Sequence, residues 1–293
     1  MLLITGASGQ LGRALCEACR RQNTPFRAFS HRELDAADAS AVNALARGPE
    51  HFDCIINCAA YTQVDAAEDH AAEAYAANAL APWNLARTGI ALIHVSTDYV
   101  FDGCGSRPYE TDDPARPLSV YGLTKRAGET ALLEGGFSGL IVRTAWVYSA
   151  DPAAKNFVNT MKRLFASRPE VSVVNDQIGA PTLAEDLAQM LLALYRKGLH
   201  RRPMQVVHAT NSGAASWYEF ACAIAQETGA ACRVRPITTS QYPTRAHRPA
   251  YSVLSLARLQ SWGIAPRGWR EALHAALCAG DLQGNGAFRE LQR

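Results

Sequence analysis

A turn with three glycines near the start of the chain constrains the fold more than any other feature of the sequence. The short apolar run Leu2–Ile4 leads directly into Gly6, Gly9 and Gly12, and a helical pattern follows over Leu11–Arg21. Gly6 permits a tight turn, Gly9 lets backbone N–H groups approach a pyrophosphate, and Gly12 lets helix and strand pack closely. The G-x-x-G-x-x-G spacing differs by one residue from the dinucleotide fingerprint. The sequence therefore predicts a dinucleotide site, with a purely structural turn as the alternative.

Short apolar runs alternate with helical patterns through the first half of the chain. The runs predict strands at Pro25–Phe29, Phe52–Asn57, Ala91–Ser96 and Gly139–Trp146. Helices are expected at Ser40–Arg47, at Thr124–Leu133 and over a long stretch, Asp65–Thr88, interrupted near Pro82. Such alternation is typical of a parallel sheet covered on both faces. The predicted fold class is α/β, a doubly wound parallel sheet of Rossmann type with a smaller interleaved α/β lobe.

The second half of the chain is less regular and is expected to supply most of that smaller lobe. Helices are expected at Phe157–Phe165, Leu183–Tyr195 and Ser216–Thr228, strands at Val171–Val174, Gln205–His208 and Arg233–Ile237, and an ordered loop at Pro243–Pro249. No low-complexity linker separates the halves, so we expect interleaved units. The dinucleotide-binding unit is expected over 1–148 and about 176–212, and the smaller lobe over about 149–175 and 213–285. The polar end, Asp281–Arg293, is expected to be loose, with 286–293 as a tail.

Composition excludes several classes of protein. Of the 293 residues, 48% are hydrophobic and 19% are charged, which argues against a disordered chain or a coiled coil. With 29 Lys and Arg against 27 Asp and Glu, the net charge of +2 is too small for a nucleic acid as the main partner. No apolar run reaches about 18 residues, so no membrane span or membrane partner is expected. The N-terminus is interpreted as a first strand and not as a signal peptide.

The eight cysteines are expected to be reduced thiols, because a chain of this length without an export signal favours the cytoplasm. Cys16 and Cys19 form a C-x-x-C pair, so a metal or redox site is the alternative. No second pair at knuckle spacing accompanies them, since Cys54 and Cys58 lie in an apolar run typical of a strand. We therefore expect no metal site and a cytoplasmic location.

The residues after the second predicted strand indicate which dinucleotide binds. A site that prefers NAD places a carboxylate on the adenosine ribose, but the second strand ends Phe29-Ser30-His31-Arg32, with no carboxylate until Glu33. Ser30 and Arg32 could instead hold a 2′-phosphate. NADPH is therefore the predicted cofactor and NADH the alternative; an ordinary solvated charge is the other interpretation of Arg32.

Tyr121 and Lys125 lie four residues apart at the start of a predicted helix, so both side chains share one face. A nearby ammonium is expected to lower the pKa of the phenol from about 10 toward the working pH. Tyr121 could then exchange a proton with a carbonyl oxygen. Thr97 follows the strand Ala91–Ser96, at the edge where doubly wound sheets bind their ligands. Its hydroxyl is the candidate to polarise the same carbonyl, with a turn cap as the alternative.

Together these motifs resemble the extended short-chain dehydrogenase/reductases, which use a Ser/Thr, Tyr and Lys triad. More specifically, nearly the whole chain resembles the dTDP-4-dehydrorhamnose reductase family. The resemblance rests on the segments Gly6–Gly12, Asn57–Glu68, Ser96–Gly103, Tyr121–Lys125, Arg143–Tyr148, Asp176–Thr182 and Arg248–Leu254. The glycine and Tyr/Lys motifs occur throughout the superfamily. Tyr61–Asp65, Ser96–Phe101 and Asp176–Thr182 are more specific to this branch.

The resemblance implies a role for each residue that matches the family's motifs. Thr97 and Tyr121 would bind the C4 oxygen of a keto sugar, with Tyr121 supplying the proton, while Lys125 would hold the nicotinamide ribose. The cofactor would also contact Gly6, Gly9, Gln10, Leu11, Gly12, Ser30, Arg32, Ala60, Tyr61 and Thr62. Asp98 and Trp146 would contact the sugar, with a core role as the alternative for Trp146.

The chain departs from the family at one point. Some members dimerise around a magnesium ion held by carboxylates, one of them a Glu where this chain has Ala14. Glu185 matches another such ligand, but the set is incomplete. We therefore expect a monomer or a weak homodimer. In the family Arg248 lies where the second lobe meets the nucleotide, so it would contact a diphosphate or form a surface salt bridge.

The implied activity is NADPH-dependent reduction of the C4 keto group of dTDP-4-dehydro-6-deoxy-L-mannose to dTDP-L-rhamnose. Two alternatives stay open. One is another 4-keto reductase or an epimerase acting on nucleotide sugars, because the triad does not separate these reactions. The other is a non-catalytic, NADP-binding regulatory subunit, since the superfamily includes the regulatory subunit of methionine adenosyltransferase.

Overall fold

The computed structural model describes residues 1–278, and its centre is a parallel sheet of six strands. The strands are β1 (Leu2–Thr5), β2 (Phe26–Phe29), β3 (Cys54–Asn57), β4 (Leu92–Thr97), β5 (Gly139–Thr144) and β10 (Gln205–His208). Their order across the sheet is β10-β5-β4-β3-β1-β2. The direction of winding reverses between β1 and β3, and sheets of this kind bind ligands outside the carboxyl ends of the strands at such a point.

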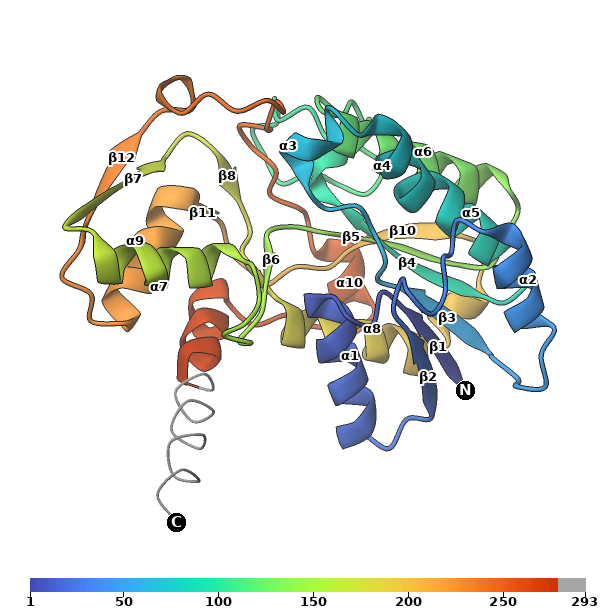
Figure 1. Cartoon of the computed structure of the whole chain (residues 1–293). Helices are drawn as coiled ribbons and strands as arrows, with labels where there is room; N and C mark the ends of the chain where they lie inside the picture. Colours follow the sequence, from blue (N-terminus) through green and yellow to red (C-terminus); the bar gives the residue numbers. More distant parts are fainter. Residues whose placement is uncertain (279–293) are drawn as a thin grey trace, which may run out of the picture.

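Helices cover both faces of this sheet (Figure 1). On one face, α1 (Gln10–Arg21) and α8 (Ala184–Arg196) lie side by side and pack against the strands in one hydrophobic cluster. On the other face, α2 (Ala39–Ala46), α5 (Ala81–Ala86) and α6 (Val120–Glu134) form a second cluster with the same strands. Burial of both apolar faces is the main force that holds such layers together. The predicted doubly wound α/β fold is confirmed.

The region expected to be one long helical stretch, Asp65–Thr88, is divided into short segments. They are α3 (Val64–Ala67), α4 (Ala71–Tyr75), the π-helical turn η1 (Ala76–Leu80) and α5. The prediction of an interruption near Pro82 is wrong, because the non-helical residues are 68–70 and helical backbone continues from residue 71 through Pro82. Pro82 lies in the first turn of α5, and the wider π-helical turn before it accommodates the proline ring.

The smaller lobe lies beside the sheet and has its own hydrophobic cluster (Figure 1). Its elements are α7 (Phe157–Ser167), α9 (Trp217–Glu227), the parallel pair β7 (Glu170–Val174) and β12 (Arg233–Ile237), the antiparallel pair β8 (Ile178–Gly179) and β11 (Ala215–Ser216), and a helical segment over 269–278. The Phe220 ring lies in this cluster, against the rings of Phe157 and Trp269.

The chain passes between the two units more than once. Between α7 and α9 it returns to the sheet through β9 (Thr182–Leu183), which pairs with β6 (Val147–Tyr148), and then through α8 and β10. Later α10 (Ala257–Ser261) returns as well, and Leu259 packs in the cluster of α1 and α8. Short 3₁₀ turns complete the described elements: η2 (Asp98–Val100), η3 (Leu199–Arg201) and η4 (Thr239–Gln241). The units are therefore interleaved, as the fold class predicts.

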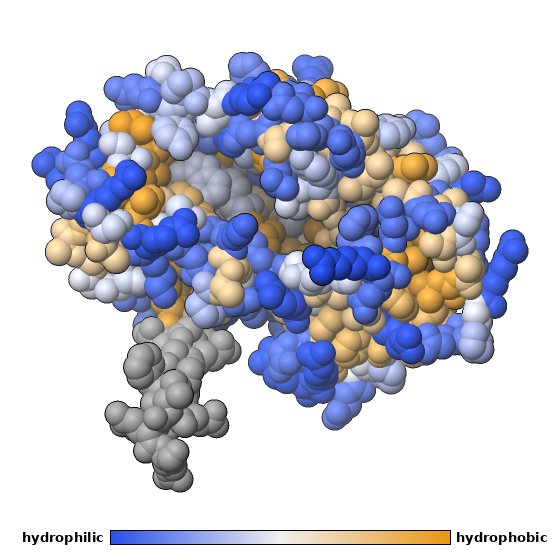
Figure 2. Space-filling view, viewed as in Figure 1, coloured by the Kyte–Doolittle hydropathy of each residue, from blue (hydrophilic) through white to orange (hydrophobic). Residues whose placement is uncertain are grey.

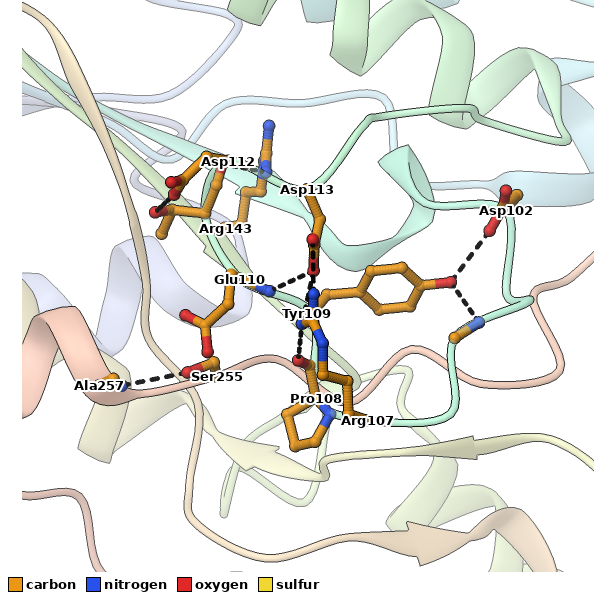
Figure 3. A network of polar contacts seen from close by, with 12 residues as sticks. Asp102, Arg107, Pro108, Tyr109, Glu110, Asp112, Asp113, Arg143, Ser255 and Ala257 are labelled. Atoms are coloured by element: carbon orange, nitrogen blue, oxygen red, sulfur yellow. Dashed lines mark hydrogen bonds and ion pairs between the residues drawn. The ribbon is translucent and has the colours of Figure 1, made fainter.

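The long loop between η2 and α6 is held in place by its own polar contacts (Figure 3). The Tyr109 hydroxyl donates to the Asp102 carboxylate at 3.0 Å, and the ring stacks on Phe101 at 4.1 Å. Arg107 donates to both carboxylate oxygens of Asp113 at 2.9 Å. A loop fixed in this way delivers α6 to the edge of the sheet in a defined position.

Two element boundaries near the site differ from expectation, and both have a local cause. The helix expected from Thr124 begins at Val120, because the Ser119 side chain caps it and accepts from the Gly122 N–H at 3.2 Å. The strand expected to reach Trp146 ends at Thr144. The backbone of Trp146 has φ +48°, in the left-handed region that no regular strand uses.

All eight cysteines are free thiols in the structure. Cys16 and Cys19 are buried on α1, and burial raises the pKa of both, so neither is a reactive thiolate. Among residues 1–278, no helix is long and apolar enough to cross a membrane. The expected loose tail lies outside the described residues, as does the end of the smaller lobe.

Candidate active site

A cleft opens at the carboxyl edge of the sheet, and Figure 2 shows the surface hollowed beside the smaller lobe. Its cavity has a volume of about 430 Å³. The start of α1, the ends of β4 and β5, and α6 line it, together with Lys155 and Trp217 of the smaller lobe. A second cavity of about 490 Å³ shares Gly9, Cys58 and Ala60 with the first and extends toward the end of β2. The two cavities therefore form one groove that crosses the glycine turn.

The glycine turn has the geometry that a dinucleotide requires. Gly6 has φ +69°, and a Cβ atom there would lie 2.5 Å from the backbone nitrogen of Ala59. A Cβ atom on Gly12 would lie 2.2 Å from the carbonyl oxygen of Gly6. Gly9 begins α1 without a side-chain cap, so the first N–H groups of the helix stay available to an anion. The residues present therefore fit a bound pyrophosphate.

Most of the predicted cofactor residues line this groove. In the first cavity they are Gly9, Gln10, Leu11, Gly12, Ala60, Thr62, Tyr121 and Lys125, and in the second they are Gly6, Gly9, Ala60 and Tyr61. Ser30 and Arg32 line neither cavity. The Ser30 hydroxyl and N–H both donate to the Glu33 carboxylate, at 2.7 and 2.8 Å, and the Arg32 side chain is exposed. His31 and Asp35 line this end of the groove instead.

Tyr121 is buried in the first turn of α6, with its ring edge-to-face against Tyr99. Burial raises the pKa of the Tyr121 hydroxyl to about 12, and the nearby Thr97 hydroxyl offsets part of that rise. This direction is opposite to the one that the Tyr/Lys spacing predicts, because burial outweighs the polar contacts of the phenol. The Lys125 amine donates to the Val95 carbonyl oxygen, 2.7 Å away. A phenol that keeps its proton at neutral pH is suited to donate it.

Lys125 lies one turn further along α6 and is 1% exposed. Burial lowers the pKa of its amine to about 8, while the Glu129 carboxylate raises it. Besides the Val95 carbonyl oxygen, the amine contacts Nε2 of His94 at 3.2 Å. An amine whose pKa lies this close to neutrality can both give and take a proton.

Thr97 ends β4 and faces the same cavity. Its hydroxyl donates to one Asp98 oxygen at 3.1 Å and accepts from the Tyr99 N–H at 3.2 Å. Thr97 therefore caps a turn and lines the cleft at once. The other Asp98 oxygen accepts from the Ser252 hydroxyl at 2.6 Å. Burial raises the pKa of Asp98 to about 6, against the lowering effect of these hydrogen bonds.

The smaller lobe contributes residues that the sequence analysis missed. The Trp217 ring stacks on the Trp146 ring with centroids 3.6 Å apart and an angle of 6° between them, and both line the cavity with Lys155. Gln10 at the start of α1 accepts a hydrogen bond from Asn156 at 2.9 Å and so joins the two units. No local pattern marks Trp217 or Lys155 as site residues, because only the packing of the two units brings them to the cleft.

Two further polar residues behind the cleft were also missed. Asn57 and His94 are buried on β3 and β4, and their side chains lie 3.0 Å apart. A signal for them exists in the sequence, since Asn57 ends an otherwise apolar strand and His94 lies between the apolar residues Ile93 and Val95. Buried polar side chains need partners, so their position indicates a hydrogen-bond network.

The remaining candidates lie at the edges of the site. Arg248 pairs with both oxygens of Asp65, at 3.1 and 2.6 Å. Of the two roles expected for Arg248, a diphosphate contact or a salt bridge, the structure contains the salt bridge. Glu185 accepts from the Ala150 N–H at 3.3 Å, and burial raises the pKa of its carboxyl. Within residues 1–278, no group of three or more His, Cys, Asp or Glu side chains is placed to hold a metal ion.

A glycine turn, a buried Tyr–Lys pair and a threonine at the carboxyl edge of a doubly wound sheet define a class of protein. It is the class of dinucleotide-dependent oxidoreductases called extended short-chain dehydrogenase/reductases. The comparison with protein families narrows this class. Residues 1–281 match the family described as the RmlD substrate binding domain, and the chain belongs to this family.

Known proteins similar to this chain agree with that family. The dTDP-4-dehydrorhamnose reductase of Mycobacterium tuberculosis (strain ATCC 25618 / H37Rv) is 45% identical over 288 residues, covering 95% of this chain and 92% of that protein. A Streptomyces antibioticus protein, named a probable dTDP-4,6-dihydroxy-2-methyloxan-3-one 4-ketoreductase, is 42% identical over 283 residues. The match covers 94% of this chain and 93% of that protein. The solved structure of the Bacillus anthracis (strain Ames) dTDP-4-dehydrorhamnose reductase in complex with NADP is 36% identical. Its TM-score is 0.89, and the match covers 95% of this chain and 98% of that one. The predicted resemblance is confirmed.

Proposed function

We propose that this protein uses NADPH to reduce the C4 keto group of dTDP-4-dehydro-6-deoxy-L-mannose, giving dTDP-L-rhamnose. The observation that carries the proposal is the meeting of Thr97, Tyr121 and Lys125 in one cleft beside the glycine turn. The names of the relatives support it, since the 45% identical protein is a dTDP-4-dehydrorhamnose reductase and the solved relative binds NADP.

The side chains of the cleft have distinct roles in this reaction. When bound, NADPH supplies a hydride to C4 of the sugar. Tyr121, which is protonated at neutral pH, donates its hydroxyl proton to the C4 oxygen. Thr97 lines the cavity together with Tyr121, and Asp98 fixes the Thr97 hydroxyl by accepting its hydrogen bond. Lys125 holds the nicotinamide ribose and supplies charge next to the phenol.

The other predicted site residues have binding roles in this proposal. Gly6, Gly9, Gln10, Leu11 and Gly12 hold the pyrophosphate, and Ala60, Tyr61 and Thr62 line the wall of the groove beside the cofactor. Asp98 and Trp146 contact the sugar, which their place on the cavity wall supports. Arg32 and Ser30 would favour NADPH over NADH after a small rearrangement that releases Ser30 from Glu33. The ratio of KM values for the two cofactors tests that preference.

The two units divide the work in the same way. We propose that 1–148 and about 176–212 bind the dinucleotide and that about 149–175 and 213–285 bind the nucleotide sugar. The separate hydrophobic clusters of the described residues support this division for most elements. Two elements cross it, because β8 pairs with β11 of the smaller lobe and α10 packs against the sheet. We also propose a cytoplasmic monomer or weak homodimer, with neither nucleic acid nor membrane as a partner. Free thiols, a net charge of +2 and Ala14 in place of a carboxylate support these points.

NADPH oxidation tests the proposal directly. The substrate is enzymatically generated dTDP-4-keto-6-deoxy-glucose, with and without the 3,5-epimerase that makes the L-sugar from it. Oxidation should require the epimerase. Tyr121→Phe should lower the rate by roughly 10²- to 10⁴-fold without unfolding the protein, because only the proton donor is lost.

A second candidate is reduction of a different dTDP-4-keto sugar. The observation that favours it is the 42% identity to the Streptomyces antibioticus ketoreductase, close to the identity with the rhamnose enzyme. Oxidation that does not require the epimerase would favour this candidate. Tightly bound cofactor with no net oxidation would instead indicate an epimerase. A stable complex with a partner enzyme and no turnover would indicate a regulatory subunit.

A further inference from the structure

Three buried polar side chains, Thr5, Asn57 and His94, form a series of contacts that ends at Lys125 and determines which ring nitrogen of His94 carries a hydrogen. Asn57, the last residue of β3, accepts two hydrogen bonds on Oδ1, from the Thr5 hydroxyl at 2.7 Å and from the Ala59 backbone N–H at 3.0 Å. A backbone N–H is always a donor, so the atom that it meets must be the amide oxygen. The amide nitrogen of Asn57 therefore faces Nδ1 of His94, 3.0 Å away.

This contact selects one tautomer of His94. The amide nitrogen of Asn57 has no lone pair to offer, so Nδ1 must accept, and the hydrogen of the neutral ring lies on Nε2. His94 is 0% exposed, and burial together with the charge of Lys125 lowers its pKa well below the usual value, which keeps the ring neutral. The Nε2–H group then faces Nζ of Lys125 at 3.2 Å.

An Nε2–H group in this position distinguishes the two charge states of Lys125. An ammonium has three hydrogens and no lone pair, so it cannot accept from His94, and two donors face each other. A neutral amine has a lone pair and accepts that hydrogen. Its own hydrogens still reach the Val95 carbonyl oxygen at 2.7 Å. The arrangement therefore stabilises the neutral amine relative to the ammonium.

We propose that His94 is a positioning residue which, fixed by Asn57 as the Nε2–H tautomer, stabilises the neutral amine of Lys125 and so makes its ammonium a stronger acid. The use of that proton in turnover rests on the proposed function, whereas the tautomer and the charge state do not. When the ammonium acts, one N–H bond of Lys125 breaks, the electron pair stays on nitrogen, and the proton replaces the one that the site has given to the C4 oxygen. The neutral amine accepts from His94 until solvent returns a proton, and His94 stays neutral throughout.

The other charged groups around Lys125 do not remove this preference. Cys58, Asp98 and Tyr121 line the same cavity, and Glu129 follows one turn along α6. Glu129 opposes His94, because its carboxylate raises the pKa of Lys125, but Arg143 binds it at 2.8 and 2.9 Å. Of the neighbouring helices, α3 and α4 carry the titratable residues Asp65, Glu73 and Tyr75, which lie toward the surface. The segments η1 and α5 carry no titratable side chain. The influence of burial is the largest, and it favours the neutral amine.

Nuclear magnetic resonance on the protein without cofactor or substrate tests this inference separately from the proposed reaction. The chain has four lysines, and of Lys125, Lys155, Lys162 and Lys197 only Lys125 is buried. Lysine labelled at Cε therefore gives few signals, and a Lys125→Met variant identifies the one from Lys125. In the wild type, the ring nitrogen shifts of His94 should show a hydrogen on Nε2 and none on Nδ1.

His94→Gln then replaces the ring by a neutral amide that has no fixed Nε2–H donor. We expect the pKa of Lys125 to rise by about one pH unit, and the alkaline limb of NADPH oxidation to move up with it. His200→Gln is the matched control and should leave the pKa of Lys125 unchanged, because His200 is equally buried but stacks on Tyr195 outside the cleft.

Two results would overturn the proposal. One is a hydrogen on Nδ1 of His94 in the wild type, and the other is an unchanged pKa of Lys125 in folded His94→Gln protein. The first measurement needs no variant, so the proposal is decided even if His94→Gln does not fold. A shifted Lys125 pKa without any turnover of dTDP-sugars would support the tautomer inference and reject the proposed reaction.

Discussion

The carboxylate of Asp98 accepts a 2.6 Å hydrogen bond from the hydroxyl of Ser252, which lies 154 residues further along the chain. Both side chains are 1% exposed. The other oxygen of Asp98 binds the Thr97 hydroxyl at 3.1 Å. The contact therefore ties the end of β4 to the segment that returns from the smaller lobe, so a distant part of the chain positions the candidate threonine.

Replacing Asp98 by Asn is expected to stabilise the protein above about pH 6 and to slow its reaction. Burial raises the pKa of Asp98 from 3.8 to about 6, so its ionisation in the folded state costs at most about 3 kcal/mol, at about 1.36 kcal/mol per pH unit. The folded protein holds this proton to a higher pH than the unfolded chain does. Wild-type stability therefore falls as pH rises from about 4 to about 6. Urea midpoints across this range should show the fall in the wild type and not in Asp98→Asn.

Ser252→Ala is the companion variant for this measurement. It removes a hydrogen bond that lowers the pKa of Asp98, so the fall in stability should extend to higher pH than in the wild type. An identical pH dependence for wild type and Asp98→Asn would contradict the argument, since Asp98 would then ionise without cost.

The parts of the site that local sequence predicts are those set by chain geometry alone. Gly6, Gly9 and Gly12 are recognisable because a turn between strand and helix requires them at fixed spacing. Tyr121 and Lys125 share a face because an α-helix places residues four apart on one side. The fold class follows similarly, since apolar runs alternating with helical patterns leave few arrangements for the sheet.

The parts that sequence does not predict depend on packing between distant segments. Trp217 reaches the cleft only because α9 packs beside the sheet, and nothing near it in the chain shows this. The pKa of Tyr121 is raised because burial outweighs its polar contacts, a balance that spacing alone does not contain. Pro82 was expected to interrupt a helix, but the π-helical turn Ala76–Leu80 before it accommodates the proline, and no sequence pattern predicted that turn.

Two glycine variants should separate cofactor binding from stability. A Cβ atom on Gly12 would lie 2.2 Å from the Gly6 carbonyl oxygen, so Gly12→Ala should destabilise the protein by several kcal/mol. A Cβ atom on Gly9 would lie 3.3 Å from the same oxygen, a tight contact that a shift of a few tenths of an ångström relieves, so Gly9→Ala should lose far less stability than Gly12→Ala. It should still bind NADPH roughly tenfold or more weakly, because the methyl group occupies the pyrophosphate path. Thermal unfolding and NADPH fluorescence titration measure both; equal affinities in Gly9→Ala and wild type would place the pyrophosphate elsewhere.

The buried pair of Glu129 and Arg143 should dominate the acid stability of the sheet. Burial alone would raise the pKa of Glu129, but two hydrogen bonds from Arg143 at 2.8 and 2.9 Å lower it below its usual value. A carboxyl with a depressed folded pKa stabilises the protein above about pH 4.5, and that contribution is lost as pH falls. Glu129→Gln leaves Arg143 buried without its partner and should cost about 3–5 kcal/mol near pH 7.

The double variant Glu129→Leu with Arg143→Met is the control for this pair. It removes both charges together, so it should cost less than Glu129→Gln in the same urea titration. A double variant that is less stable than the single one would show that the pair contributes more than the desolvation of its charges.

Trp217→Ala should weaken binding of the sugar more than binding of the cofactor. Trp217 stacks on Trp146, whose backbone has φ +48°, so the stack holds Trp146 in a conformation that a bulky residue adopts at a cost. Without it, Trp146 is free to leave the cavity wall, and we expect a roughly tenfold higher KM for the dTDP-sugar. The affinity for NADPH should stay within about twofold, because the pyrophosphate binds at the glycine turn, and Trp217→Phe should restore most of the loss by keeping an aromatic face. Steady-state kinetics with both substrates varied checks this, and an equal loss of NADPH affinity would assign Trp217 to the cofactor side of the cleft.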